Sequence, residues 1–173
     1  MSEAKPEVST PSEPHTSVWR WWNELQTDDR AGRAELRRCG TAAEVAFTAP
    51  YHRLLQRLGS RLSEGDARRV AAIAAILAHV EKEPKDRASF AKAMGTPKSA
   101  KLGSVVSDSR FRHLLRNEEA DELLRELVRV VRQLDRVASV DSLFRDLMKW
   151  DEPTRMRWAR AFYEAAPITK KSA

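Results

Sequence analysis

The sequence predicts an all-α protein, a compact helical bundle of about eight helices in two small lobes. Apolar residues recur at helical spacing along most of the chain, and no segment alternates between apolar and polar residues for long. Glycine accounts for only 6 of the 173 residues, whereas Ala, Leu, Arg and Glu, which favour helices, are common. With 42% hydrophobic residues, the chain can form a core in one ordinary domain or in two small lobes.

The N-terminal lobe is predicted over residues 17–95 and follows a tail, residues 1–16. Because the tail has several prolines and few apolar residues, we expect it to be disordered. The helices of this lobe are expected to start near residue 17 and then to cover residues 28–39, 41–44, 51–58, 66–80 and 89–94. At helix starts we expect Asp28 or Asp29, Thr41 with Glu44, and Pro50. At helix ends we expect Gly40 and Gly59.

A basic loop, residues 96–106, is predicted to join the lobes, because the segment GTPKSAKLGS is rich in Gly, Pro, Ser and Lys. The C-terminal lobe is predicted over residues 107–167, followed by a basic tail, residues 168–173. Its helices are expected at residues 107–116, 118–137, 140–148 and 151–166. Asp151 is expected to cap the last helix, with Pro153 in its first turn.

The tryptophans of the first helix differ in their positions on the helix surface. Trp19, Trp22 and Leu25 share one face, which predicts that they pack in the core. Trp21 lies off this face, so we predict that it is the tryptophan most exposed to solvent or to a partner.

The sequence contains no motif for catalysis, metal binding or a cofactor. It lacks HExxH, a Walker loop, GxGxxG and GxSxG, and it is not expected to be an enzyme. His79 and Glu83 lie one helical turn apart, but this spacing is common by chance and predicts no metal site. The single cysteine, Cys39, is expected to be structural. Without an apolar leader or a stretch of ~20 apolar residues, a cytoplasmic protein with no membrane partner is expected.

Basic residues outnumber acidic residues by 31 to 25, which favours an anionic partner. Residues 98–116 carry five basic side chains against Asp108, and a flexible loop that leads into a basic helix is suited to a phosphate backbone. A second basic feature is a stripe on one side of the helix 118–137, formed by Arg125, Arg129, Arg132 and Arg136. Both features are also compatible with a solvated surface whose charges pair along the helix, as in Asp121–Arg125.

Taken in order, several segments resemble the CasB small-subunit family of the type I-E Cascade complex. The N-terminal segments are RAELRRC and YHRLLQRLG, which follow a tryptophan-bearing helix. The middle segments are SFAKAMG and SRFRHLLRNEEADELLRELVRVVRQL, and the closing segment is LFRDLMKWDEPTRMRWARAFYEA. The resemblance covers about residues 17–166 and rests on the order and spacing of the segments.

This resemblance implies a non-catalytic, all-helical subunit that is present in two copies in an RNA-guided complex. Its implied partners are the guide RNA, the target and displaced DNA strands, other Cascade subunits and a second copy of itself. The residues to which the family's nucleic-acid-binding role is best transferred are Arg38, Arg53, Lys92, Arg110, Arg116 and Arg129. At the position of Lys92 the family is expected to have arginine. The full set of predicted nucleic-acid-binding residues is Arg37, Arg38, Arg53, Lys92, Lys98, Lys101, Arg110, Arg112, Arg116, Arg125, Arg129, Arg132 and Arg155.

A different class of function is also compatible with the sequence. In this alternative the protein is a helical scaffold whose basic surface binds acidic protein partners rather than nucleic acid. Salt-dependent binding to single-stranded DNA of random sequence would separate the two classes.

Overall fold

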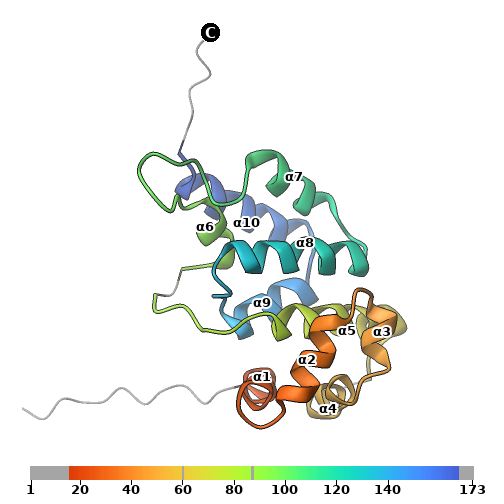
Figure 1. Cartoon of the computed structure of the whole chain (residues 1–173). Coiled ribbons are helices and arrows are strands. Elements are labelled where there is room, and N and C mark those ends of the chain that lie inside the picture. The colour runs from red at the N-terminus through yellow and green to blue at the C-terminus, as the bar shows by residue number, and fades with distance from the viewer. Residues whose placement is uncertain (1–15, 60, 87, 168–173) are drawn as a thin grey trace, which may run out of the picture.

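The computed structural model describes residues 16–59, 61–86 and 88–167, and within these ranges the chain forms ten α-helices and no β-strand (Figure 1). The helices are α1 (Ser17–Thr27), α2 (Arg30–Arg38), α3 (Ala42–Ala46), α4 (Ala49–Leu58), α5 (Glu64–Ala78), α6 (Phe90–Gly95), α7 (Asp108–Arg116), α8 (Ala120–Gln133), α9 (Val140–Met148) and α10 (Glu152–Ala165). The predicted all-α class is confirmed, with ten helices where about eight were expected. The predicted tails lie outside the described residues, except that Thr16 caps α1.

Helix starts follow the caps predicted from the sequence. The side chains of Asp29, Thr41 and Asp151 each accept a hydrogen bond from a backbone N–H in the first turn of their helix. Gly59 ends α4 in the left-handed region, at φ 62°. The prediction for Gly40 was wrong, because α2 ends one residue earlier, at the extended Cys39, and the Gly40 N–H donates to Glu44.

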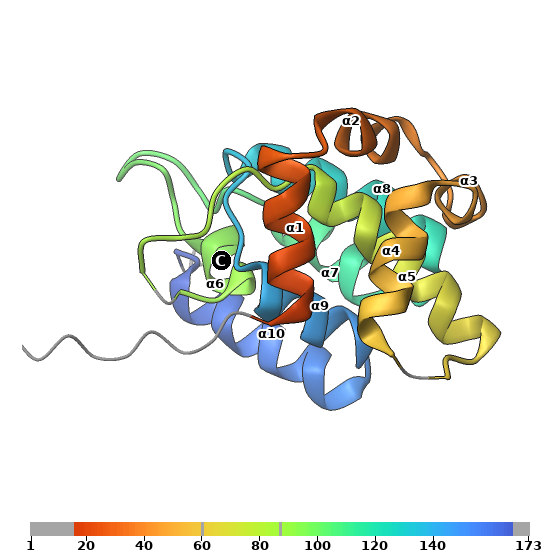
Figure 2. The same cartoon turned by 90° about the horizontal axis from the view of Figure 1, so that it is seen from below.

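Helix α5 lies at the centre of the molecule. It packs against α2 and α3 from the N-terminal half of the chain and against α8 and α9 from the C-terminal half (Figures 1 and 2). Every residue from Val70 to Ala78 is buried, and the alanines among them allow neighbouring helices to approach closely. Helices on both sides of residues 96–106 therefore contribute to one core, and the division into two lobes stays a prediction.

Helix α1 is covered on more than one side, because it contacts both α4 and α9. The Trp21 side chain is only 1% exposed, and its indole N–H donates to the Pro50 carbonyl at 2.9 Å. The prediction that Trp21 would be the most exposed tryptophan was therefore wrong. Trp22 is also buried, and its indole N–H donates to the Val80 carbonyl at 3.2 Å.

Helices α6 and α10 pack closely against each other beside the shared core. Phe90 of α6 contacts Trp158 of α10, with ring centroids 5.8 Å apart. Next to this pair, Phe111 of α7 stacks on Phe162 of α10 at 3.9 Å. The Phe111–Phe162 pair fixes α7 to α10, at the end of the molecule where the loop 96–106 also lies (Figure 1).

Asp146 is a buried carboxylate that joins α9 to α10. It accepts hydrogen bonds from the Arg157 guanidinium at 2.6 Å and from the Trp158 indole N–H at 2.8 Å.

We expect Asp146→Ala to lower the free energy of unfolding by about 2–3 kcal/mol, because the buried Trp158 N–H loses its acceptor. Urea denaturation monitored by circular dichroism measures this change. Glu152→Ala, an exposed substitution on α10, is the matched control, and equal losses in the two variants would contradict the assignment.

Candidate nucleic-acid interface

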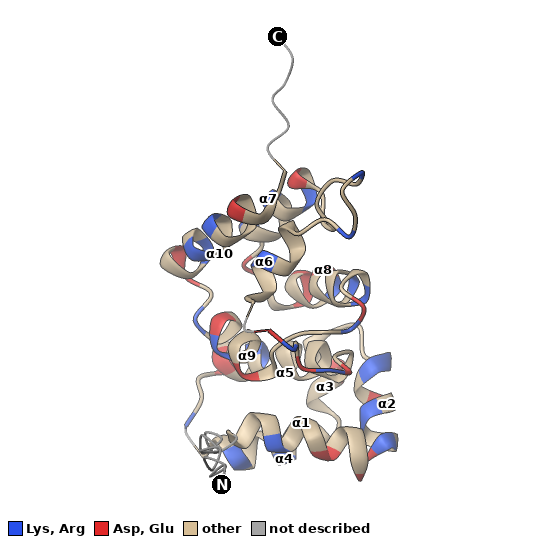
Figure 3. Cartoon of the chain, turned by 90° about the vertical axis from the view of Figure 1, so that its left-hand side faces the viewer, with Lys and Arg blue, Asp and Glu red and all other residues tan. Residues whose placement is uncertain are grey.

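The predicted nucleic-acid-binding residues lie on several faces of the molecule. Figure 3 shows Lys and Arg on α2, on the loop between α6 and α7, at the end of α8 and on α10. They therefore come from several helices and one loop rather than from a single element. Which of them are available to a ligand depends on the acidic side chains around each.

Five of the predicted residues form ion pairs within the protein. Arg53 pairs with Asp29, and Arg155 pairs with Glu118 at 2.9 Å and also donates to the Leu115 carbonyl. The other three pairs are Lys98–Asp135 at 3.2 Å, Arg112–Asp108 at 2.8 Å and Arg129–Glu126 at 3.1 Å. Arg53 and Arg155 each join two parts of the fold through their ion pairs, so a structural role explains the presence of arginine at these two positions.

The other eight predicted residues form no ion pair with any residue in the described ranges. They are Arg37, Arg38, Lys92, Lys101, Arg110, Arg116, Arg125 and Arg132. Asp121, which the sequence offered as a partner for Arg125, instead accepts from Arg68 at 2.9 Å and from the Ala42 N–H at 2.8 Å. Unpaired cations on a solvated surface are available to an anionic partner.

A groove between α7 and α8 brings two predicted residues together. We call it the α7–α8 groove; it has a volume of about 360 Å³ and is lined by Ser107, Ser109, Arg110, His113, Glu126 and Arg129. Glu126 is its one acidic residue and is already paired with Arg129, so Arg110 leaves the groove with a net positive charge. Two guanidinium groups and two hydroxyl groups supply several hydrogen-bond donors, which suits a phosphate group.

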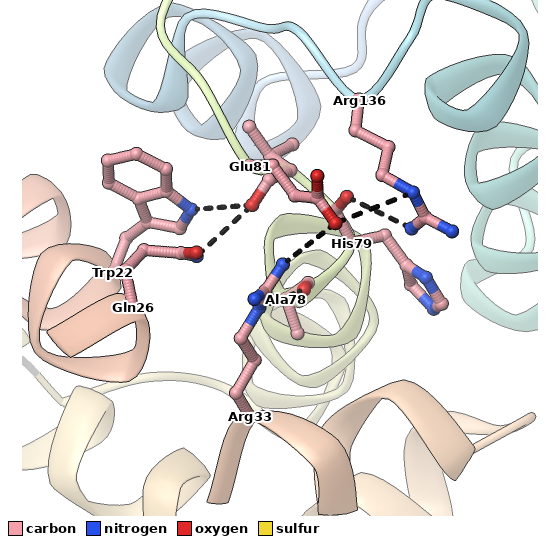
Figure 4. A network of polar contacts seen from close by, with 8 residues as sticks. Trp22, Gln26, Arg33, Ala78, His79, Glu81 and Arg136 are labelled. Carbon is pink, nitrogen blue, oxygen red and sulfur yellow. Dashed lines mark hydrogen bonds and ion pairs between the residues drawn. The ribbon is translucent and has the colours of Figure 1, made fainter. Parts of the chain in front are cut away.

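A second group of basic residues lies between α2 and the end of α8. We call it the arginine cluster; its members are Arg33, Arg37, Arg132 and Arg136, and it surrounds Glu81 and His79. Figure 4 shows Arg33 and Arg136 approaching Glu81 from opposite sides. Their guanidinium nitrogens lie 3.5 Å and 3.6 Å from the same carboxylate oxygen of Glu81.

The sequence predicted Arg37 and Arg132 as site residues. Arg136 was assigned to the arginine stripe but not to the predicted site, and Arg33 was missed. The spacing of four residues within each pair, Arg33–Arg37 and Arg132–Arg136, was a signal that the members of a pair share a helix face. The meeting of the two pairs requires the tertiary structure, because residues of α2 and of α8 are about 100 positions apart.

Electrostatic repulsion is concentrated in the arginine cluster. Burial, followed by the positive charges of Arg136 and Arg33, lowers the pKa of Arg37. Burial, followed by the charges of all four arginines, lowers the pKa of His79 to about 4, so this imidazole is neutral at pH 7. The positive charge of the region therefore resides on the guanidinium groups.

The described ranges contain no group of three or more His, Cys, Asp and Glu residues arranged to hold a metal ion. Glu83, the possible partner of His79 in such a site, instead accepts a hydrogen bond from the Val140 N–H at 2.9 Å and so caps α9. Within the same ranges, every helix is too short or too polar to cross a bilayer.

The fold and these surfaces define the class of protein: an all-helical bundle with basic, solvent-facing sites suited to anions. Residues 32–163, well over half of the chain, match the family described as CRISPR-associated protein Cse2. The chain belongs to this family, which confirms the resemblance noted in the sequence.

Two solved structures show the same fold. One is a chain in the crystal structure of E. coli Cascade bound to a PAM-containing dsDNA target, with 17% identity, a TM-score of 0.67 and coverage of 88% of this chain and 97% of that chain. The other is CasB from Thermus thermophilus, with 22% identity, a TM-score of 0.60 and coverage of 87% of this chain and 100% of that chain. No curated protein matches the sequence.

Proposed function

We propose that the protein is the non-catalytic small subunit of a Cascade complex in the cytoplasm, and that it binds nucleic-acid backbone there. In this role it stabilises the duplex of guide RNA and target DNA and holds the displaced DNA strand. Its partners are these nucleic acids, other Cascade subunits and a second copy of itself. Membership of the Cse2 family supports the assignment to Cascade, and a chain of the same fold is part of the E. coli complex with a dsDNA target.

At the level of individual residues, the proposal rests on the α7–α8 groove. Arg110 and Arg129 come from two helices and line one groove together with two serine hydroxyls. A phosphate in the groove accepts hydrogen bonds from these groups and completes the charge balance of Arg110. Contacts of this kind carry no sequence information, which suits a complex in which guide pairing supplies the specificity.

A second candidate function is a helical scaffold that binds protein partners. The observation that favours it is Phe47, whose side chain is 89% exposed between α3 and α4. Aromatic side chains, Phe included, are enriched at protein–protein interfaces relative to the rest of the protein surface. The two functions are compatible within one complex, but only the first requires direct binding of DNA.

We expect the double substitution Arg110→Gln and Arg129→Gln to weaken binding of single-stranded DNA at low salt. With two phosphate contacts removed, the slope of log affinity against log salt should become shallower by about 1.4. The effect should be the same for unrelated DNA sequences, because phosphates do not differ between them. Fluorescence anisotropy of labelled DNA at several salt concentrations measures both quantities.

The matched control for this experiment is Arg160→Gln, an exposed arginine of α10 that is outside the predicted set. Circular dichroism establishes that each variant is folded. If the double variant keeps the affinity and salt slope of the wild type, the groove is a solvated surface. Binding of acidic proteins without binding of DNA would favour the scaffold.

A further inference from the structure

Two members of the arginine cluster have a clear structural role. The Arg33 Nε–H donates to the Ala78 carbonyl at 3.1 Å, and an Arg136 Nη1–H donates to the His79 carbonyl at 3.5 Å. These carbonyls lie at the C-terminal end of α5, where cations are favourable. Both arginines also pair with Glu81 (Figure 4).

The other two members, Arg37 and Arg132, have no such explanation. Neither guanidinium group forms a hydrogen bond or an ion pair with any residue of the described ranges, although both groups lie close enough to His79 to lower its pKa. Glu81 is the one acidic neighbour that acts on Arg37, and it is already shared by Arg33 and Arg136. Four positive charges therefore face one negative charge.

This arrangement is unfavourable in the absence of a further anion. Arg37 is half-buried, so water screens its repulsion from Arg136 and Arg33 only in part. An anion placed among the guanidinium groups would remove this repulsion and would accept charge-assisted hydrogen bonds from them.

A second observation points to the same place. His79 is only 3% exposed, yet its ring nitrogen Nδ1 has no hydrogen-bond partner in the described part of the chain. Buried polar atoms are normally paired, so an unpaired one calls for a partner such as a bound ion or water. In Figure 4 the His79 ring lies beside the Arg136 side chain, on the side of α5 that faces the end of α8.

We propose that the arginine cluster binds a single tetrahedral oxyanion of the phosphate class, with Arg37 and Arg132 as its direct ligands and His79 at the base of the site. A tetrahedral anion offers oxygens in several directions and suits guanidinium groups that arrive from two helices. The planar Glu81 carboxylate, by contrast, presents both of its oxygens in one plane and, among the described residues, pairs with Arg33 and Arg136 only. The source of the phosphate is either a nucleic-acid phosphodiester or the free ion. The site stands on its own geometry and does not depend on the α7–α8 groove.

The test uses the full chain, inorganic phosphate as the probe and sodium chloride at equal ionic strength as the reference. Phosphate should raise the Tm of the wild type more than chloride does, and the rise should saturate. In Arg37→Gln with Arg132→Gln, phosphate binding should weaken at least about tenfold, because two charge-assisted contacts are lost. In chloride alone this variant should melt at or above the temperature of the wild type, because the repulsion is relieved.

Controls and alternative outcomes separate this site from the groove. Arg30→Gln with Arg160→Gln removes two exposed arginines that are outside the predicted set and should leave the phosphate effect intact. The Arg110 and Arg129 double variant removes the phosphate contacts proposed for the groove and is therefore a second background for the test. Phosphate should still raise its Tm, and adding Arg37→Gln and Arg132→Gln should abolish the rise, so failure of the groove proposal does not imply failure of this one. A phosphate effect no larger than that of chloride, or one that survives when all four substitutions are combined, would overturn the proposal.

A second arm identifies the source of the phosphate. If the ligand is a nucleic-acid backbone, the Arg37 and Arg132 variant should bind single-stranded DNA with a salt slope shallower by about 1.4, and phosphate should compete with DNA. If the ligand is the free ion, DNA affinity should be unchanged in the variant while the effect of phosphate on the Tm is lost. Either result supports an oxyanion site.

Discussion

Replacing Gly95 by alanine is expected to lower the free energy of unfolding by about 3 kcal/mol or more. A Cβ atom at this position would overlap the carbonyl oxygen of Phe162 and lie 3.1 Å from the carbonyl carbon and 3.2 Å from the Ala166 nitrogen. All three are backbone atoms of α10 or its C-terminal end, and they cannot rotate away as a side chain can. The two helices must therefore separate, which loosens the aromatic contact between Phe90 and Trp158.

Urea denaturation of the Gly95→Ala variant, monitored by circular dichroism, measures this loss. Gly103→Ala is the matched control, because a Cβ at Gly103 meets no atom within 4 Å and Gly103 lies in an exposed loop. Its stability should stay within about 0.5 kcal/mol of the wild type. Equal stability of both variants would show that α6 and α10 do not pack as described.

Acidification is expected to destabilise the protein through His79. Its pKa is lowered to about 4 in the folded protein, from a usual value of 6.5. Well above pH 6.5 the imidazole is neutral in both the folded and the unfolded state, so His79 makes its full contribution to the stability of the fold. As the pH falls from 6.5 to 4, the unfolded state takes up the proton first, so roughly 3 kcal/mol of stability is lost.

The measurement is urea denaturation of the wild type and of His79→Gln between pH 7 and pH 4, in buffers free of phosphate. The difference in unfolding free energy between the two proteins isolates the contribution of His79 from that of the carboxylates. Gln56→Ala, at an exposed position on α4 without a titratable group, is the control and should follow the pH curve of the wild type. Parallel curves for the wild type and His79→Gln would show that His79 is not held neutral.

Much of the helical pattern could be predicted because its signals are local. Asp29, Thr41 and Asp151 cap helices through hydrogen bonds within three residues, and the sequence alone contains that information. The end of α8 was harder to predict, since apolar residues continue to Val137 but the helix stops at Gln133. There Asp135 and Arg136 adopt left-handed backbone angles, and the Arg136 carbonyl accepts from the backbone N–H groups of Glu81 and Lys82. This contact joins segments far apart in sequence.

The candidate sites likewise depend on contacts between segments that are far apart in the sequence. The arginine stripe on one helix was visible in the sequence, but the sequence did not show which arginines are neutralised by acids from other helices. Asp121 provides an example, because its partner proved to be Arg68 of α5 rather than Arg125 of its own helix. Likewise, the arginine cluster forms only where side chains from α2 and from the end of α8 approach His79 at the end of α5.

The pairing of α6 with α10 also has a consequence during protein synthesis. Glu152 follows Gly95 by 57 residues, so a ribosome that adds roughly 5–20 residues per second completes α6 about 3–11 s before α10 begins. For that interval Phe90, Ala91 and Met94, which α10 later helps to bury, lack this partner. Within the described residues, the apolar face of α6 is therefore completed only by a helix that is made much later.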